Sequence, residues 1–78
     1  MTETKKKFLR VIADMKPQMQ IMPLKVIFNE TEYLIDSVID IKFQIVPIFG
    51  ERCFAYYCKI KGKLKIIYLD KDFNWFVI

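Results

Sequence analysis

Four lysines at alternate positions in the second half of the chain are its strongest candidate for chemistry. They are Lys59, Lys61, Lys63 and Lys65. Alternation places side chains on one face of a β-hairpin, and Tyr57 is expected on that same face. A basic ribbon with an aromatic ring is what small barrels use against phosphates and stacked bases. The same lysines would also protect an exposed strand edge from pairing with other chains.

The other polar side chains give little support for catalysis. The chain has no histidine, which removes the commonest general base and a common metal ligand. Its one serine, Ser37, is expected inside a strand as a core hydroxyl bonded to the backbone. Asp36 and Asp40 share a strand face, but their Cα atoms would lie roughly 13 Å apart, too far for a carboxylate pair. We therefore expect no enzyme and assign no catalytic, cofactor-binding or metal-binding residue.

Cys53 and Cys58 are predicted to be free thiols. They are separated by five positions on an expected strand, so their Cα atoms lie about 16 Å apart, beyond the reach of a disulfide. The odd separation also points the two side chains to opposite faces. The apolar segment after the N-terminal lysines is too short for a signal peptide. We therefore expect a cytoplasmic protein with both thiols reduced.

Size and composition indicate one all-β domain over residues 1–78. Of the 78 residues, 54% are apolar and 28% are charged, which suits a single folded domain. Twelve isoleucines, five valines and seven phenylalanines stand against two alanines, and β-branched and aromatic residues favour pleated strands. The apolar runs are far shorter than the about 20 residues of a membrane span. The net charge of +4 suits an anionic partner as well as ordinary solubility.

The residues from 33 to 45 alternate between apolar and polar side chains. The apolar set is Tyr33, Ile35, Ile39, Ile41, Phe43 and Ile45, and the polar set is Asp36, Asp40, Lys42 and Gln44. Successive side chains on a strand point to opposite faces. The pattern therefore predicts one extended strand that buries its isoleucines on one face and exposes its charges on the other.

Further strands are predicted on both sides of this segment. Residues 24–28 join it through a short polar turn at 29–31. Residues 53–59 and 64–68 form a second hairpin, for which we prefer a three-residue loop ending at Gly62, because that register puts the apolar side chains on a common face. Residues 70–72 make the last turn, before a closing strand over 73–78.

The first segment, residues 4–15, fits two kinds of element. Four apolar residues match the i, i+3, i+4, i+7 spacing of an amphipathic helix: Phe8, Val11, Ile12 and Met15. The rival is a strand over 7–14, in which adjacent apolar pairs pack on both sides. The residues alone leave both alternatives open.

Several short strings form a pattern that extends over residues 8–77. They are Pro23-Leu24-Lys25-Val26-Ile27-Phe28, Tyr33-Leu34-Ile35-Asp36-Ser37-Val38-Ile39-Asp40, Tyr57-Cys58-Lys59-Ile60-Lys61-Gly62, Ile67-Tyr68-Leu69 and Trp75-Phe76-Val77. The pattern resembles a family of small uncharacterised bacterial all-β domains of unknown function. The resemblance implies a compact all-β domain with 8–14 as its first strand, and it transfers no site residues. The chain departs from the pattern by lacking a glycine at 16–19 and after Asp72.

Together these observations predict five or six antiparallel strands, curled into a small SH3-like barrel or a strongly bent meander. Apolar residues of both parities, such as Ile27, Leu34 and Phe76, exceed what one core face can hold, which indicates a patch that a partner covers. We therefore predict a non-enzymatic interaction module that self-associates as a homodimer or docks to another protein. The alternative is a small-barrel nucleic-acid-binding protein that uses the lysine-rich hairpin. We identify no cofactor, membrane partner or small-molecule substrate.

Overall fold

The computed structural model describes residues 6–17, 20–46 and 49–78, and all the regular elements in these ranges are β-strands. In chain order they are β1 (Lys7–Met15), β2 (Ile21–Phe28), β3 (Thr31–Leu34), β4 (Ser37–Val46), β5 (Glu51–Ile60), β6 (Lys63–Leu69) and β7 (Trp75–Val77). The all-β prediction is confirmed, with seven strands where five or six were expected. Within the described ranges there is no helix of the length and apolarity that a membrane crossing requires.

The strands form one open antiparallel sheet in the order β3-β2-β1-β7-β6-β5-β4. Its two edge strands, β3 and β4, are consecutive in the chain and are linked by Ile35 and Asp36. The Ile35 amide donates to the Leu24 carbonyl of β2 (3.0 Å), whereas the Asp36 amide donates to the Lys59 carbonyl of β5 (2.8 Å). The chain therefore passes from one end of the sheet to the other between two residues, which requires the sheet to curl.

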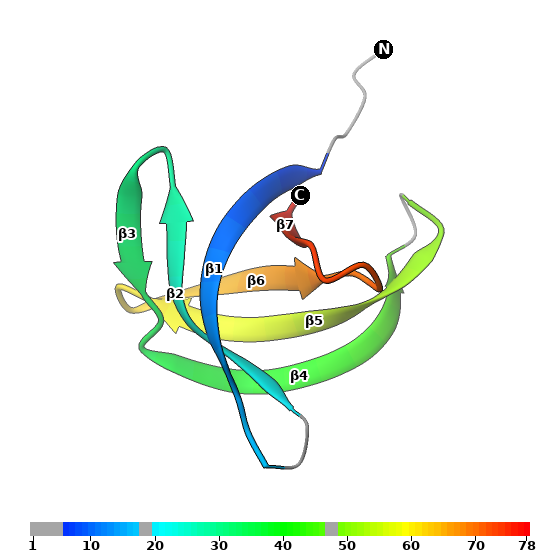
Figure 1. Cartoon of the computed structure of the whole chain (residues 1–78), viewed down its shortest axis with the longest axis horizontal. Helices are drawn as coiled ribbons and strands as arrows, with labels where there is room; N and C mark the ends of the chain where they lie inside the picture. The colour runs from blue at the N-terminus through cyan, green and yellow to red at the C-terminus, as the bar shows by residue number, and fades with distance from the viewer. Residues whose placement is uncertain (1–5, 18–19, 47–48) are drawn as a thin grey trace.

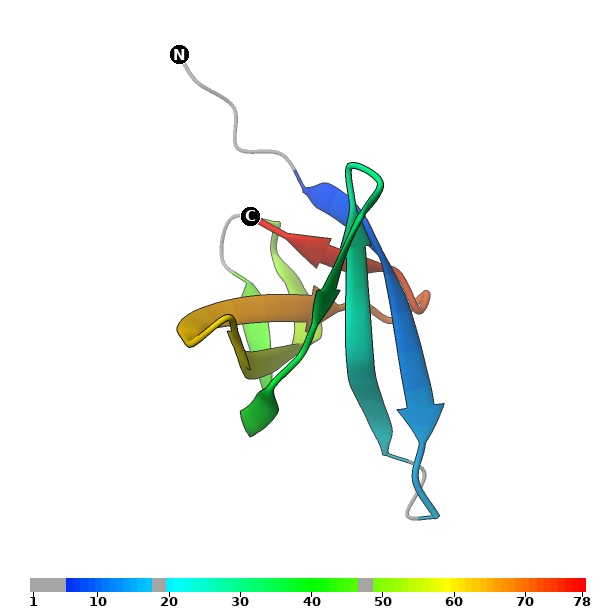
Figure 2. The same ribbon diagram turned by 90° about the vertical axis from the view of Figure 1, so that its left-hand side faces the viewer.

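The sheet bends at β1. The first residues of β1, 7–9, pair with β7, and its remaining residues, 10–15, pair with β2. A bulge at Leu24 in the β1–β2 pairing lies beside Pro23, which has no amide hydrogen to give to a regular ladder. Figures 1 and 2 show β1, β2 and β3 on one side of the molecule and β4, β5 and β6 on the other. The strand alternative for the first segment is confirmed over Lys7–Met15, while residues 4–5 lie outside the described ranges.

Both faces of the curled sheet bury apolar side chains. The inner cluster, which the two halves of the sheet enclose, contains Val26, Tyr56, Cys58, Ile67, Leu69 and Trp75. The outer cluster, on the opposite face, contains Val46, Cys53 and Phe76, with Phe49 and Tyr68 packed against it. The neighbours Trp75 and Phe76 therefore belong to different clusters. Apolar residues of both parities are needed because two faces are covered.

The predicted single strand over 33–45 is wrong, because the chain departs from regular β-structure twice. It is interrupted at residues 35–36, where β3 ends and the chain crosses to β4. Within β4, Ile39 forms a bulge between Val38 and Asp40 in the pairing with β5. Each break changes which face the following side chains occupy.

The prediction that this segment buries its isoleucines is therefore only partly correct. Ile35 and Ile41 pack against the inner cluster. Ile39, Phe43 and Ile45 have exposed fractions of 56%, 57% and 54%. Their exposure follows from the position of β4 at the end of an open sheet, where no further described strand covers them.

The hairpin between β5 and β6 has a two-residue turn in place of the predicted three-residue loop. Ile60 pairs with Lys63, which leaves Lys61 and Gly62 in the turn with φ angles of +52° and +75°. Two positive φ angles define a type I′ turn, whose twist matches that of the flanking strands. The prediction failed because it assumed one apolar face, whereas the outer face also packs apolar side chains, Tyr68 among them.

The other two turns lie where they were predicted. The β2–β3 hairpin turns at Asn29 and Glu30, with φ angles of +50° and +64°. In the last turn, the Asp70 carboxylate accepts hydrogen bonds from the amides of Asp72 and Asn74, both at 2.9 Å. The closing strand is shorter than predicted and spans only Trp75–Val77.

Candidate functional site

The four lysines of the predicted basic ribbon do not share a face. Lys59, on β5, lies on the outer face with Tyr57, whose ring centre is 5.1 Å from the Lys42 Nζ. Lys63 and Lys65, on β6, lie on the inner face, because the two-residue turn reverses the expected parity of β6 relative to β5. The prediction that the four lysines and Tyr57 share one face is therefore wrong.

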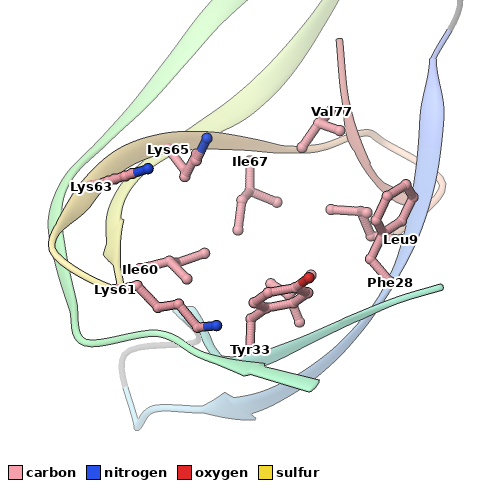
Figure 3. Close-up of a pocket in the computed structure, with 10 residues that line it drawn as sticks. Leu9, Phe28, Tyr33, Ile60, Lys61, Lys63, Lys65, Ile67 and Val77 are labelled. Atoms are coloured by element: carbon pink, nitrogen blue, oxygen red, sulfur yellow. The ribbon is translucent and has the colours of Figure 1, made fainter. Parts of the chain in front are cut away.

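Three of these lysines line a pocket at one end of the inner face. Lys61, Lys63 and Lys65 line a space of about 470 Å³. Figure 3 shows these lysines together with the other labelled lining side chains. The remaining lining side chains are apolar or aromatic: Leu9, Val26, Phe28, Tyr33, Ile60, Ile67 and Val77. They come from β1, β2, β3, β5, β6 and β7, so the pocket forms only when the sheet curls.

The β5–β6 turn directs the Lys61 side chain across the pocket, away from β5 and β6 and toward Tyr33 of β3 (Figure 3). The Lys61 Nζ lies 5.2 Å from the centre of the Tyr33 ring, within the range of a cation–π contact. The turn is anchored by Gly62, whose amide donates to the Asp36 carboxylate at 3.2 Å. Figure 3 shows the Lys61 side chain extending toward Tyr33. The β3–β4 link and the β5–β6 turn thus position the same end of the pocket.

The rim of the pocket is positively charged and its floor is apolar. Lys61, Lys63 and Lys65 are exposed, and none forms an ion pair with another residue that the structure describes. The lining residues include no aspartate or glutamate. The floor is formed by Val26 and Ile67, which are 5% and 1% exposed and belong to the inner cluster. The arrangement can hold an apolar group on the floor and an anionic group at the rim.

The second candidate surface is the free edge of β4. Its residues pair with β5 on one side, except for the bulged Ile39, and no described strand pairs with the other side. Beside this edge, the Phe43 ring packs at a tilt against the half-exposed Phe54, with 4.8 Å between their ring centroids. An unpaired strand edge next to exposed apolar rings is a site where another chain can bind.

The apolar surface beside β4 continues into a second hollow of about 580 Å³. Its lining includes Ile21, Ile41, Phe54, Tyr56, Leu69 and Phe73. The Tyr56 hydroxyl donates to the Ile21 carbonyl at 2.6 Å and so connects β5 to β2 below this hollow. Gln20, Asp70 and Lys71 also line this hollow, so charges of both signs border it, whereas the pocket near the β5–β6 turn has only lysines as charged residues.

The polar residues considered for catalysis, Ser37, Asp36 and Asp40, form no hydrogen bond to one another among the residues that the structure describes. Ser37 is exposed at the start of β4, so its predicted burial within a strand is wrong. Asp40 accepts a hydrogen bond from the Ile41 amide at 2.8 Å, whereas Asp36 contacts the Gly62 amide. In the part of the chain that the structure describes, no three His, Cys, Asp or Glu side chains gather as a metal site.

Both cysteines are free and lie on opposite faces, as predicted, and the structure buries both of them. Burial raises the pKa of the Cys58 thiol to about 11 and also raises the pKa of Cys53. At neutral pH neither thiol is ionised, and the thiolate is the form that acts as a nucleophile. These cysteines therefore serve as packing residues.

The raised pKa of Cys58 predicts a loss of stability at alkaline pH. The unfolded thiol ionises near pH 9 and the folded thiol near pH 11, so the unfolded state binds fewer protons between these values. The contribution of Cys58 is complete below pH 9 and decreases through pH 11, by about 1.4 kcal/mol for each pH unit at most. Urea unfolding from pH 8 to 11 measures this slope, and Cys58→Ala is expected to flatten it. An equal slope in both proteins would contradict the prediction.

Comparisons with protein-family models, curated proteins and solved structures found no match for this chain. The resemblance to small bacterial all-β domains therefore stays a prediction. Two surfaces are left from which to infer a function, the lysine-rimmed pocket and the free edge of β4.

Proposed function

We propose that the protein is a non-enzymatic interaction module that self-associates as a homodimer through the free edge of β4. The observation that supports this proposal is a ten-residue edge strand with Ile39, Phe43 and Ile45 more than half exposed. A second copy of β4 would pair with the unused backbone groups of this edge and cover the apolar side chains beside it. We further propose that the curled sheet is an open variant of a small SH3-like barrel, since residues 35–36 bond to both ends of it.

The sequence of β4 is complementary to itself in an antiparallel arrangement. If Ile41 lies opposite Ile41 of the second copy, Asp40 lies opposite Lys42 of the second copy, and symmetry repeats this pair. Moving the two-fold axis by one residue would place Lys42 against Lys42 or Asp40 against Asp40. Opposite charges across a strand pair contribute roughly 0.2–1 kcal/mol, and like charges are destabilising. Charge therefore favours the register centred on Ile41.

Charge reversal tests this homodimer. Asp40→Lys and Lys42→Asp each place like charges opposite one another at two symmetric positions, so each is expected to weaken dimerisation about tenfold. Mixing the two variants is expected to restore dimerisation, because every facing pair in the mixed dimer then has opposite charges. Sedimentation equilibrium over a range of protein concentrations measures the dissociation constants of the wild type, of each variant and of the mixture.

A matched control for Lys42→Asp is Lys59→Asp, which makes the same change of net charge on β5, one strand in from the β4 edge, where Lys59 pairs with Ser37. It is expected to leave dimerisation unchanged. A wild-type protein that stays monomeric at high concentration would refute the proposal. So would a mixture of the two variants that associates no better than each variant alone.

Nucleic-acid binding is the alternative function, and the geometry gives it less support. A single strand needs basic side chains that follow its phosphates along one face. Lys59 lies with Tyr57 on the outer face, whereas Lys63 and Lys65 lie on the inner face. Lys61, Lys63 and Lys65 therefore line a pocket, and the four lysines do not form a continuous track.

A further inference from the structure

The pocket beside the β5–β6 turn has the size and lining of a small-molecule site. Its volume of about 470 Å³ lies within the roughly 300–1,000 Å³ that is typical of ligand pockets. Its floor, Val26 and Ile67, is held firmly because both side chains are nearly fully buried in the inner cluster. The half-buried Tyr33 and the partly exposed Phe28 lie on the side of β2 and β3. A bound apolar group would contact side chains from both halves of the sheet.

Charge in the pocket is confined to one hairpin. Lys61, Lys63 and Lys65 are close together in sequence and belong to the β5–β6 turn and β6, and each lacks an ion-pair partner among the described residues. Three like charges around one apolar space repel one another, and a bound anion would relieve that repulsion. Low-dielectric walls strengthen the attraction between these lysines and an anion.

We propose that this pocket binds an amphipathic anion, a small molecule with an apolar body and one carboxylate or phosphate group. The apolar body lies on Val26 and Ile67, and the anionic group lies among Lys61, Lys63 and Lys65. This site is separate from the β4 edge that the proposed self-association uses. A nucleic-acid strand fits the pocket less well, because Lys59 and Tyr57 lie on the other face of the sheet.

To test the proposal, the full chain is titrated with decanoate and with decyl phosphate. Calorimetry measures the affinity, and amide NMR spectra show which residues respond. Both probes are expected to bind saturably with one site per chain and to shift the amide signals of Phe28, Tyr33 and Lys61–Ile67. Decanol, which has the same chain without the charge, is expected to bind about tenfold more weakly. If only one of the two anions binds, the anionic group of the natural ligand is of that type.

A matched pair of variants distinguishes binding in the pocket from a general effect of net charge on the affinity for anions. Lys65→Glu and Lys59→Glu change the net charge equally on the same hairpin, but only Lys65 lines the pocket. Lys65→Glu is expected to weaken decanoate binding about tenfold. Lys59→Glu is expected to leave decanoate binding unchanged. Asp40→Lys, the variant that tests self-association at the β4 edge, is also expected to leave decanoate binding unchanged.

Several results would overturn the proposal. One is the absence of saturable decanoate binding. Another is an equal loss of decanoate affinity in Lys65→Glu and in Lys59→Glu. A third is a decanol affinity equal to the decanoate affinity. Tighter binding of a short oligothymidylate that depends on Lys65 would assign the lysines to nucleic acid and would likewise overturn it.

Discussion

Phe76→Ala is expected to lower the free energy of unfolding by about 3–5 kcal/mol. Phe76 is fully buried in the outer cluster. Its ring centroid lies 5.3 Å from that of Tyr68, 6.0 Å from that of Phe49 and 6.3 Å from that of Phe8, and the Lys6 Nζ lies 4.7 Å from it. Removing the ring deletes the contact that joins β1, β6 and β7 to the turn before β5.

Urea unfolding followed by circular dichroism measures this loss, in solutions dilute enough to keep the protein monomeric. A small domain has a total stability near the lower end of roughly 5–15 kcal/mol, so the variant is expected to be partly unfolded without denaturant. Phe43→Ala is the matched control, since it makes the same chemical change at a residue that is 57% exposed. Its expected cost is below about 1 kcal/mol. Equal losses for the two variants would show that the outer cluster is not a core.

Trp75→Ala is expected to have an effect of similar size on the opposite face of the same strand, about 3–5 kcal/mol. Trp75 is 9% exposed in the inner cluster, and its ring centroid lies 5.1 Å from that of Tyr56. Tyr56 in turn donates to the Ile21 carbonyl, so the indole supports the contact between the two halves of the sheet. Its loss loosens the enclosed core as well as removing apolar area.

The control for this prediction is Trp75→Phe, which keeps an aromatic ring against Tyr56. It is expected to lower the free energy of unfolding by less than half as much as Trp75→Ala. Urea unfolding of both variants gives the two values, and amide hydrogen exchange shows where protection is lost. The expected losses are in β2 and β5, the strands that the Tyr56 hydroxyl connects. A Trp75→Ala protein as stable as Trp75→Phe would contradict the position of the indole in the inner cluster.

Local features of the sequence predicted the strands, two of the turns and the state of the cysteines. Alternating apolar residues placed segments of β2, β4, β5 and β6 correctly. Short polar segments predicted the turns at 29–31 and 70–72, because residues there accept positive φ angles or bond to nearby amides. The odd spacing of Cys53 and Cys58 predicted their opposite faces, since β5 runs without a bulge between them. Each of these properties depends on residues that are neighbours in the chain.

The tertiary structure alone decided which faces are covered. A period of two distinguishes two faces of a strand, but it does not tell which face meets another part of the sheet. The bulge at Ile39 and the type I′ turn at residues 61–62 each changed the face of the side chains that follow. The pocket combines side chains of six strands, and the exposure of Phe43 follows from an open edge. These features arise from pairings between residues far apart in the chain, which the pattern within one segment does not contain.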